Sequence, residues 1–224
     1  MGGGVCSGKF PGCDMHILFN RSMARALSLM TLLLCAHVHA ESLLWGGRPE
    51  FGIELEQEKT PDHLGVTNSI TYIPSLSFPD GPVNRVDLLI MDEREKDLSS
   101  GVSDTTRVTK LAVRLRKNVH FTDDWGMYFR GLLGHYSSSA ERFVYGYTDA
   151  ALRYEHDFFG FIAGVRVQRS LDGTPGHDLN KFRLGPSFDI GEHHELEFRW
   201  VRAWDAHTHA RESDSTILEY TYKF

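Results

Sequence analysis

Polar and apolar side chains alternate one by one through residues 110–121. The apolar positions are interrupted only by Lys117, and most of the positions between them are basic or polar. Successive side chains of a β-strand point to opposite faces of its sheet, so this period predicts a strand that is apolar on one face and basic on the other. The same period recurs from residue 41 to the end of the chain, where we find no helical period of useful length.

The pattern predicts about ten strands of about 9–12 residues each, a length that suits tilted strands crossing a bilayer. Some connections are short, namely 79–84, 122–125, 156–159 and 191–194. The alternate connections are mostly longer and more polar, namely 97–106, 137–145, 170–180 and 206–215. Short turns at one end and long loops at the other are typical of bacterial outer-membrane barrels. We therefore predict an all-β fold, a transmembrane antiparallel up-and-down β-barrel of about 10–12 strands in the cell outer membrane.

Composition limits the alternatives. The net charge of -6 gives no basic excess for binding nucleic acid. Charged residues make up 24% of the chain, which is too polar for a helical membrane protein. A barrel tolerates this polarity, because only every second strand residue meets lipid.

The N-terminal part of the chain has the layout of a secretory signal peptide. Two arginines precede an apolar run at 26–36, and small or compact residues follow it up to Ala40. This order predicts export and cleavage after Ala40. We expect residues 1–40 to be an N-terminal extension plus signal peptide, and residues 41–224 to form the barrel. All three cysteines precede the cleavage point, so the mature chain would form no disulfide.

The polar faces of the predicted strands carry many basic residues. A soluble barrel or sandwich would also alternate, but with its apolar face inward, and it would then expose these charges in mid-strand. A membrane barrel turns them into a polar lumen instead. The predicted pore-lining residues are Lys110, Arg114, Arg116, Arg130, Arg153, Arg166, Arg183 and Arg199.

Two interpretations of this lumen stay open, because the registers between strands decide which charges meet. In the first, the basic residues pair with acidic ones and fill the barrel. The acidic candidates are Glu54, Glu56, Asp149, Glu155, Asp189, Glu197 and Glu219. In the second, Lys110, Arg114 and Arg116 form one wall that selects anions.

The last strand ends on alternating apolar and aromatic residues, namely Leu218, Tyr220, Tyr222 and Phe224. This ending resembles the terminal strand by which the outer-membrane assembly machinery recognises its barrels, so that machinery and the membrane lipid are expected partners. Aromatic rings favour the level of the lipid headgroups. We expect such positions for Trp45, Trp125, Trp200, Trp204, Tyr128, Tyr145, Tyr147 and Tyr154.

Segments 180–189, 195–199 and 218–224 resemble the C-terminal half of the oligogalacturonate-specific porin family. Residues 145–147 and 152–155 add to the resemblance. It implies a small monomeric barrel of about twelve strands that passes acidic oligosaccharides through an arginine-lined pore. No arginine of this chain can be matched to a pore residue of that family.

Two short motifs raise the hypothesis of a barrel hydrolase. Asp205 and His207 resemble the Asp-x-His pair of omptin proteases, but we find no convincing second acidic pair. His135 and Ser137 resemble the His-x-Ser of lipid A deacylases, but they lie mid-chain rather than near the final strands. Nucleophilic catalysis also needs a third, orienting carboxylate. We therefore predict no catalytic residues.

A metal site and a cofactor are not expected either. Four histidines cluster in pairs at opposite predicted ends of the barrel. One pair is His193 and His194, and the other is His207 and His209. Two histidines in one place are too few for a closed site. The expected function is passive passage of small anionic or sugar-like solutes through an arginine-lined lumen. The alternatives are a closed structural or adhesive barrel that acts through its outer loops and, third, a hydrolase.

Overall fold

The computed structural model of the chain describes residues 47–61, 65–78, 81–97 and 104–224. The expected signal peptide at 1–40, the three cysteines and Trp45 lie outside the described residues. Among the described residues, no helix has the length and apolar character needed to cross a membrane.

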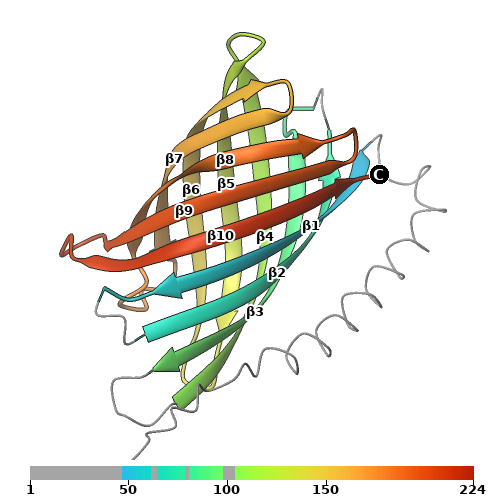
Figure 1. Cartoon of the computed structure of the whole chain (residues 1–224). Helices are drawn as coiled ribbons and strands as arrows, with labels where there is room; N and C mark the ends of the chain where they lie inside the picture. The colour runs from blue at the N-terminus through green and yellow to red at the C-terminus, as the bar shows by residue number, and fades with distance from the viewer. Residues whose placement is uncertain (1–46, 62–64, 79–80, 98–103) are drawn as a thin grey trace, which may run out of the picture. The chain divides into compact units, whose positions relative to one another are not determined.

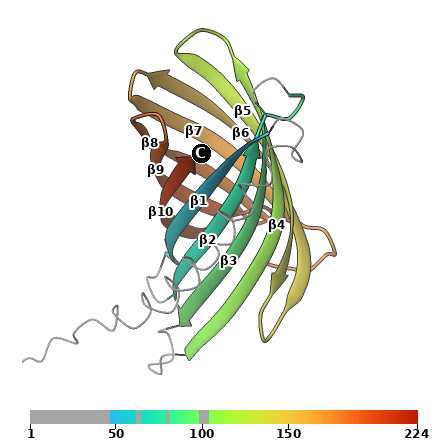
Figure 2. The ribbon, with the colours of Figure 1, turned by 90° about the vertical axis from the view of Figure 1, so that its right-hand side faces the viewer.

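The described chain folds into one closed antiparallel β-barrel (Figures 1 and 2). Its strands are β1 Arg48–Lys59, β2 Gly65–Ser77, β3 Arg85–Asp97, β4 Asp104–His120, β5 Trp125–Ser137, β6 Arg142–His156, β7 Phe159–Ser170, β8 Leu179–Ile190, β9 His194–Asp205 and β10 Arg211–Lys223. Each strand pairs with its neighbours in sequence, and β1 pairs with β10 to close the barrel. The prediction of an up-and-down barrel of 10–12 strands is confirmed. The twelve strands implied by the resemblance are not found, since the described residues form ten.

Two of the predicted outer loops are shorter than expected, because strand pairing continues into them. β6 begins at Arg142, which pairs with Ser137 inside the predicted loop 137–145. β10 begins at Arg211, which pairs with Trp204, and an irregularity in the register follows between Arg211 and Ser213. The barrel wall therefore extends further on this side than the sequence indicated.

The turns at the opposite end are tight. Asp157, between β6 and β7, has a φ of 51°, and Gly191, between β8 and β9, has a φ of 68°. Asp and Gly are among the few residues that adopt this left-handed conformation at low cost. These positions make reversals of only two or three residues between long strands, with the registers fixed on both sides.

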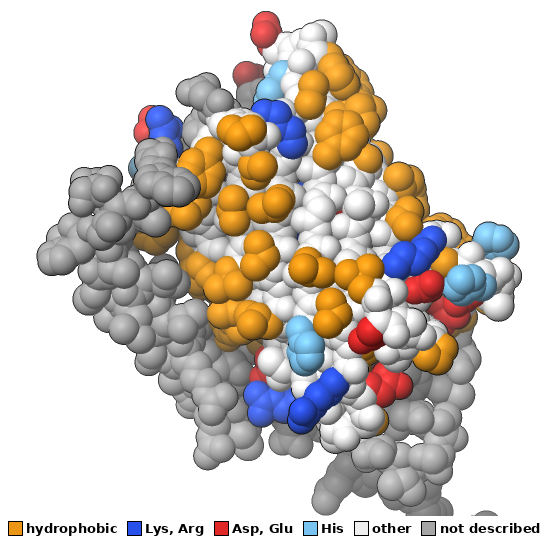
Figure 3. Space-filling view, turned by 180° about the vertical axis from the view of Figure 1, so that it is seen from behind, with side chains coloured by type: hydrophobic (Ala, Val, Ile, Leu, Met, Phe, Trp, Pro, Cys, Tyr) orange, Lys and Arg blue, Asp and Glu red, His pale blue; other side chains and the backbone are white. Residues whose placement is uncertain are grey.

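The outer surface of the strands is apolar. Large side chains such as Leu133 and Val165 are 58% and 56% exposed. Figure 3 shows hydrophobic side chains spread over the strands, with charged side chains toward the edges of the view. An apolar face of this extent is unstable in water but is the surface that lipid requires. The protein is therefore an outer-membrane β-barrel.

The C-terminal strand follows the predicted alternation. Leu218 and Tyr220 face outward, and the ring of Tyr222 packs against that of Phe224 with centroids 4.8 Å apart. Recognition of these four residues by the assembly machinery stays a prediction.

Candidate functional site

The central part of the barrel interior is filled by charged side chains that are almost completely buried. Arg183 and Arg199 are only 2% and 1% exposed, and Asp87 is 1% exposed. Each occupies an inward position of its strand, because the alternation that turns apolar residues to lipid turns polar residues to the lumen. A charge buried to this degree needs partners of opposite sign, so the ion pairs of this layer decide how open the lumen is.

Arg199 on β9 is surrounded by three glutamates, and we call this group the Arg199 cluster. Its Nη2 donates to Oε2 of Glu54 on β1 at 2.7 Å and to Oε2 of Glu219 on β10. Its Nε lies 2.8 Å from Oε1 of Glu197 on the same strand. Three carboxylates around one guanidinium give this side of the lumen an excess of negative charge.

Asp149 on β6 has the reverse arrangement, the Asp149 cluster. It accepts a hydrogen bond from Nε of Arg166 on β7 at 3.2 Å and another from Nη2 of Arg183 on β8. Nε of Arg130 on β5 lies 3.8 Å from its Oδ2. In the strand order of the closed barrel, β6 and β5 lie across from β1 and β10. The layer therefore has a positive wall that faces a negative one.

A third, balanced group connects the two walls on β3 and β4. Asp87 accepts hydrogen bonds from Nε of Arg85 at 2.6 Å and from Nε of Arg114 at 2.5 Å. Nη1 of Arg85 also lies 2.9 Å from Oε2 of Glu50 on β1. Two arginines and two carboxylates neutralise one another here.

Tyr128 on β5 is 1% exposed and lies among three guanidinium groups. The Cζ atoms of Arg116, Arg130 and Arg183 are 4.5, 4.4 and 5.2 Å from the centre of its ring. The negative face of an aromatic ring attracts such cations. The expectation that Tyr128 lies at the membrane interface is wrong, because Tyr128 occupies an inward position like that of Arg130.

The same correction applies to two other tyrosines. Tyr145 and Tyr147 on β6 share the inward face with Asp149, and both line a cavity in the lumen. Tyr147 lies under Arg166, whose Cζ is 4.0 Å from the ring centre. By contrast, Trp125 is exposed on the barrel exterior. Its place at the level of the lipid headgroups stays a prediction.

The charged layer lies between two cavities. The outer cavity, on the side of the β7–β8 and β9–β10 loops, has a volume of about 360 Å³ and reaches down to Arg183 and Arg199. The other cavity lies on the side of the short turns and is called the periplasmic cavity after the predicted orientation of the barrel. It has a volume of about 410 Å³ and is lined by Arg116, Arg153 and Glu195, among others. Charged side chains line part of both cavities, so the lumen offers charged groups on either side of the layer.

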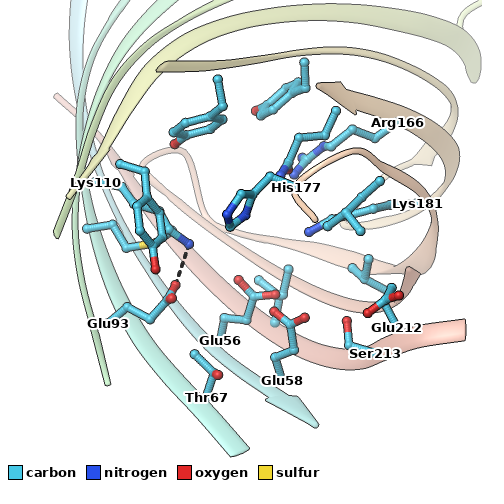
Figure 4. Close-up of a pocket in the computed structure, with 18 of the residues that line it drawn as sticks. Glu56, Glu58, Thr67, Glu93, Lys110, Arg166, His177, Lys181, Glu212 and Ser213 are labelled. Atoms are coloured by element: carbon cyan, nitrogen blue, oxygen red, sulfur yellow. Dashed lines mark hydrogen bonds and ion pairs between the residues drawn. The ribbon is translucent and has the colours of Figure 1, made fainter. Parts of the chain in front are cut away.

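Charges are also divided between the walls of the outer cavity (Figure 4). Glu56 and Glu58 project from β1 on one side, and Arg166 and Lys181 lie on the other side, on β7 and β8. Lys110 forms an ion pair with Glu93, since its Nζ lies 2.6 Å from Oε2 of that residue. The cavity therefore presents an acidic side and a basic side to anything that enters it.

The loop 171–178 is fastened over the outer mouth. Asp172 accepts hydrogen bonds from the backbone N–H of Val144 and the hydroxyl of Thr174, and these lower the pKa of its carboxyl group. The backbone N–H of Ser170 and the ring of His207 lower the pKa of Asp178 in the same way. Both carboxylates therefore stay ionised to a lower pH than an ordinary aspartate does.

His177, in the same loop, lines the outer cavity. Its ring stacks on that of Phe143 with centroids 4.0 Å apart, and its Nε2 lies 2.9 Å from Oε2 of Glu141. Phe143 in turn stacks on Tyr136 at 4.5 Å. An aromatic surface thus lines the cavity beside its charged walls.

The eight predicted pore-lining side chains all lie in the barrel interior: Lys110, Arg114, Arg116, Arg130, Arg153, Arg166, Arg183 and Arg199. Seven of them form ion pairs with carboxylates. Within the described chain, Arg116 alone among the eight has no carboxylate partner; its Nε donates to Oδ1 of Asn118 at 2.9 Å. The predicted wall of Lys110, Arg114 and Arg116 is therefore neutralised at two of its three positions.

Sequence reasoning missed the partners that neutralise this wall. Asp87 and Glu93 lie on β3, whose sequence carries acidic residues on both faces near its end. Asp92, next to Glu93, points outward and pairs with Arg107 instead. Odd-numbered positions of β3 face the lumen. The one sequence signal for this was the apolar side chains at the even positions Val86, Leu88 and Ile90, which assign the even face to lipid.

Two of the hydrolase candidates, Asp205 and His207, make structural hydrogen bonds in the outer loops. Oδ1 of Asp205 accepts hydrogen bonds from the backbone N–H groups of His207 and Thr208, which is a turn-forming pattern. His135 lies on the outward face of β5, beside the exposed Leu133. No group of three or more His, Cys, Asp or Glu side chains in the described chain is arranged to hold a metal ion.

Among known proteins, the chain is similar to solved structures only at the level of the fold. No family model and no curated protein matches the chain. Among solved structures, the COG4313 outer membrane channel from Pseudomonas putida F1 is similar with a TM-score of 0.51 and 13% identity, over 79% of this chain and 96% of that one. The translocator domain of autotransporter NalP from Neisseria meningitidis matches with a TM-score of 0.47 and 12% identity, over 91% and 98%. The KdgM porin in complex with disordered oligogalacturonate matches with a TM-score of 0.41 and 9% identity, over 79% and 98%.

Proposed function

We propose that this protein is an outer-membrane channel for small polar solutes that carry a carboxylate. The observation that carries the proposal is the division of the lumen into two cavities with charged side chains in their linings by one layer of side chains. Side chains change rotamers far more readily than strands move, so the layer can open without a change in the barrel. Similar barrels that are named as channels and porins agree with this role at the level of fold alone.

Arginines on one wall supply the path for the carboxylate. Arg166 and Arg183 border the outer cavity, Arg130 lies in the layer, and Arg116 and Arg153 border the periplasmic cavity. A guanidinium binds a carboxylate through two parallel hydrogen bonds. A solute carboxylate would take the place of Asp149 as the partner of successive arginines. Acidic oligosaccharides, which the resemblance implies, belong to this class of solute.

Barrel size limits the solute. A barrel of about ten strands leaves little room once its inward side chains are in place. The cavities of about 360 and 410 Å³ accept a monosaccharide or a molecule of similar size. A longer chain would have to pass in an extended form.

Single-channel recording tests the proposal. We expect small, stable conductance steps in a planar bilayer, with a preference for anions measured from reversal potentials. Arg116→Glu should reduce or reverse this preference, because Arg116 is the interior arginine without a carboxylate partner in the described chain. Arg107→Glu is the matched control, since Arg107 lies on the exterior. A folded, heat-modifiable barrel without conductance would refute the channel.

The nearly complete burial of the layer favours one second candidate, a closed barrel that acts through its outer loops. Arg183 and Arg199 leave almost no surface for a passing solute in the resting structure. Under this hypothesis no variant of the layer conducts, and changes in the loop 171–178 alter adhesion of cells instead.

A further inference from the structure

We infer that the outer cavity is a binding site for a small zwitterion, a solute with one ammonium and one carboxylate group. The inference deepens the proposed function by naming its solute. Binding and passage are nevertheless separate properties, since a site in the outer cavity fills whether or not the layer beneath it opens.

The basic side of the cavity has hydrogen-bond donors without partners. Arg183 uses Nη2 on Asp149, but its Nε and Nη1 are buried and have no hydrogen-bond partner among the described residues. Lys181 forms no ion pair with any described side chain. It lies directly across from Arg166 in the register of β7 and β8, so two cations are neighbours here. Buried donors without acceptors cost free energy, and a ligand carboxylate would recover it once the guanidinium of Arg183 turns toward the cavity.

The acidic side has carboxylates without cations. Glu54, Glu56 and Glu58 occupy successive inward positions of β1, so they form a line that rises from the layer toward the mouth. Glu54 is engaged by Arg199, whereas Glu56 and Glu58 form no ion pair with a described residue. Glu212 adds a further carboxylate from β10. An ammonium group is the natural partner for this side.

The space between the two sides suits a ligand that reaches both. Only β9 separates β8 from β10, and its inward residues at this level are Val201 and Ala203. Adjacent strands lie about 4.8 Å apart, so along the wall β8 with Lys181 is about 10 Å from β10 with Glu212. It is about 14 Å from β1, which carries the other glutamates of the acidic side. Ala203 of β9 and Ser213 of β10 lie between Lys181 and the glutamates of β1. No polar side chain of β9 competes for the ligand there.

Both charges are needed to satisfy the cavity. A simple anion would bind near Lys181 and Arg183 but would be repelled by Glu56 and Glu58. A simple cation would bind the glutamates and leave the donors of Arg183 unpaired. The stacked rings of Tyr136 and Phe143 offer an apolar surface for the rest of the ligand.

A matched ligand series tests the site. The protein, expressed as the full chain and isolated from outer membranes in detergent, is titrated calorimetrically with 5-aminopentanoate, pentanoate and pentylamine. We expect the zwitterion to bind about tenfold or more tightly than either of the others, since each charged end makes charge-assisted hydrogen bonds. Equal binding of pentylamine and 5-aminopentanoate, or of pentanoate and 5-aminopentanoate, would overturn the inference.

Variants then assign each end of the ligand. Lys181→Gln should weaken the zwitterion about tenfold and leave pentylamine unchanged, whereas Glu56→Gln with Glu58→Gln should weaken the zwitterion and pentylamine alike. Neither set touches an ion pair of the layer, so folding is retained. Lys96→Gln and Glu192→Gln, which do not line the cavity, are the controls. Unchanged zwitterion affinity in all variants would overturn the assignment.

Passage is measured separately by swelling of liposomes that contain the protein in 5-aminopentanoate. Binding without swelling would refute the channel and keep the site. Swelling without preferential binding would keep the channel and refute the site.

Discussion

Glu54 and Glu219 lie directly opposite each other across the pairing of the first and last strands, and both accept a hydrogen bond from Nη2 of Arg199. Like charges at opposed positions of neighbouring strands repel each other. Because Arg199 lies between the two carboxylates and attracts both, it offsets their repulsion. It thereby links three strands at the place where the barrel closes. The closing seam is therefore held by side chains as well as by its backbone ladder.

Replacing Arg199 with Met should destabilise the barrel strongly. The variant leaves three buried carboxylates without their cation, and breaking a buried pair in this way costs about 3–5 kcal/mol. Urea unfolding in lipid vesicles measures the loss. Arg202→Met, which removes an exterior pair with Asp214, should cost less than about 1 kcal/mol. Similar losses in the two variants would contradict the role of the seam.

Replacing Asp149 with Asn should increase anion conductance. The variant removes the only carboxylate of the Asp149 cluster and leaves Arg130, Arg166 and Arg183 without it. Their mutual repulsion loosens the layer and adds positive charge to the lumen. Larger single-channel steps with stronger anion preference are expected. Steps of unchanged size and selectivity would mean that this layer does not limit the current.

The loop 171–178 should loosen in acid. Hydrogen bonds to the carboxylates lower the pKa of Asp172 and of Asp178 below the ordinary value of about 3.9. A lowered pKa means that the folded loop binds the proton less well than the unfolded loop does. The stabilisation is therefore complete above about pH 4 and is lost as the pH falls through the lowered pKa values.

Hydrogen exchange of the backbone amides of Val144 and Ser170, which donate to these carboxylates, follows this change. Protection should fall on acidification while the strands stay protected. Asp172→Asn should weaken the protection of Val144 at neutral pH and remove much of its dependence on pH. Asp157→Asn, in a turn at the other end of the barrel, is the control. Protection that is constant down to pH 2 would contradict the prediction.

Gly185 should not tolerate a side chain, because a Cβ atom there would clash with the backbone oxygen of Phe198 on β9. Gly185→Ala forces β8 and β9 apart and should cost about 1–3 kcal/mol or more in the free energy of unfolding. Gly131→Ala is the matched control, since nothing lies within 4 Å of a Cβ at that mid-strand glycine. Equal stability of the two variants would show that the β8–β9 contact relaxes freely.

The sequence was sufficient for the faces of the strands and insufficient for their pairing. Alternation assigned Arg114 and Arg183 to the lumen, because a strand offers only two faces. It did not identify Asp87 as the partner of Arg114, since that contact depends on the register of β3 with β4. Tyr128 was misplaced because residue type was weighed above position in the alternation.

The Arg199 and Asp149 clusters also restrict how this protein can change during evolution. Each cluster holds one charge of one sign among several of the other, so the loss of any member exposes the rest to repulsion or leaves them unpaired. Substitutions in the lumen should therefore become fixed as sets that span several strands rather than one at a time. Among related sequences, positions 54, 197, 199 and 219 should vary together, even where none of them is invariant.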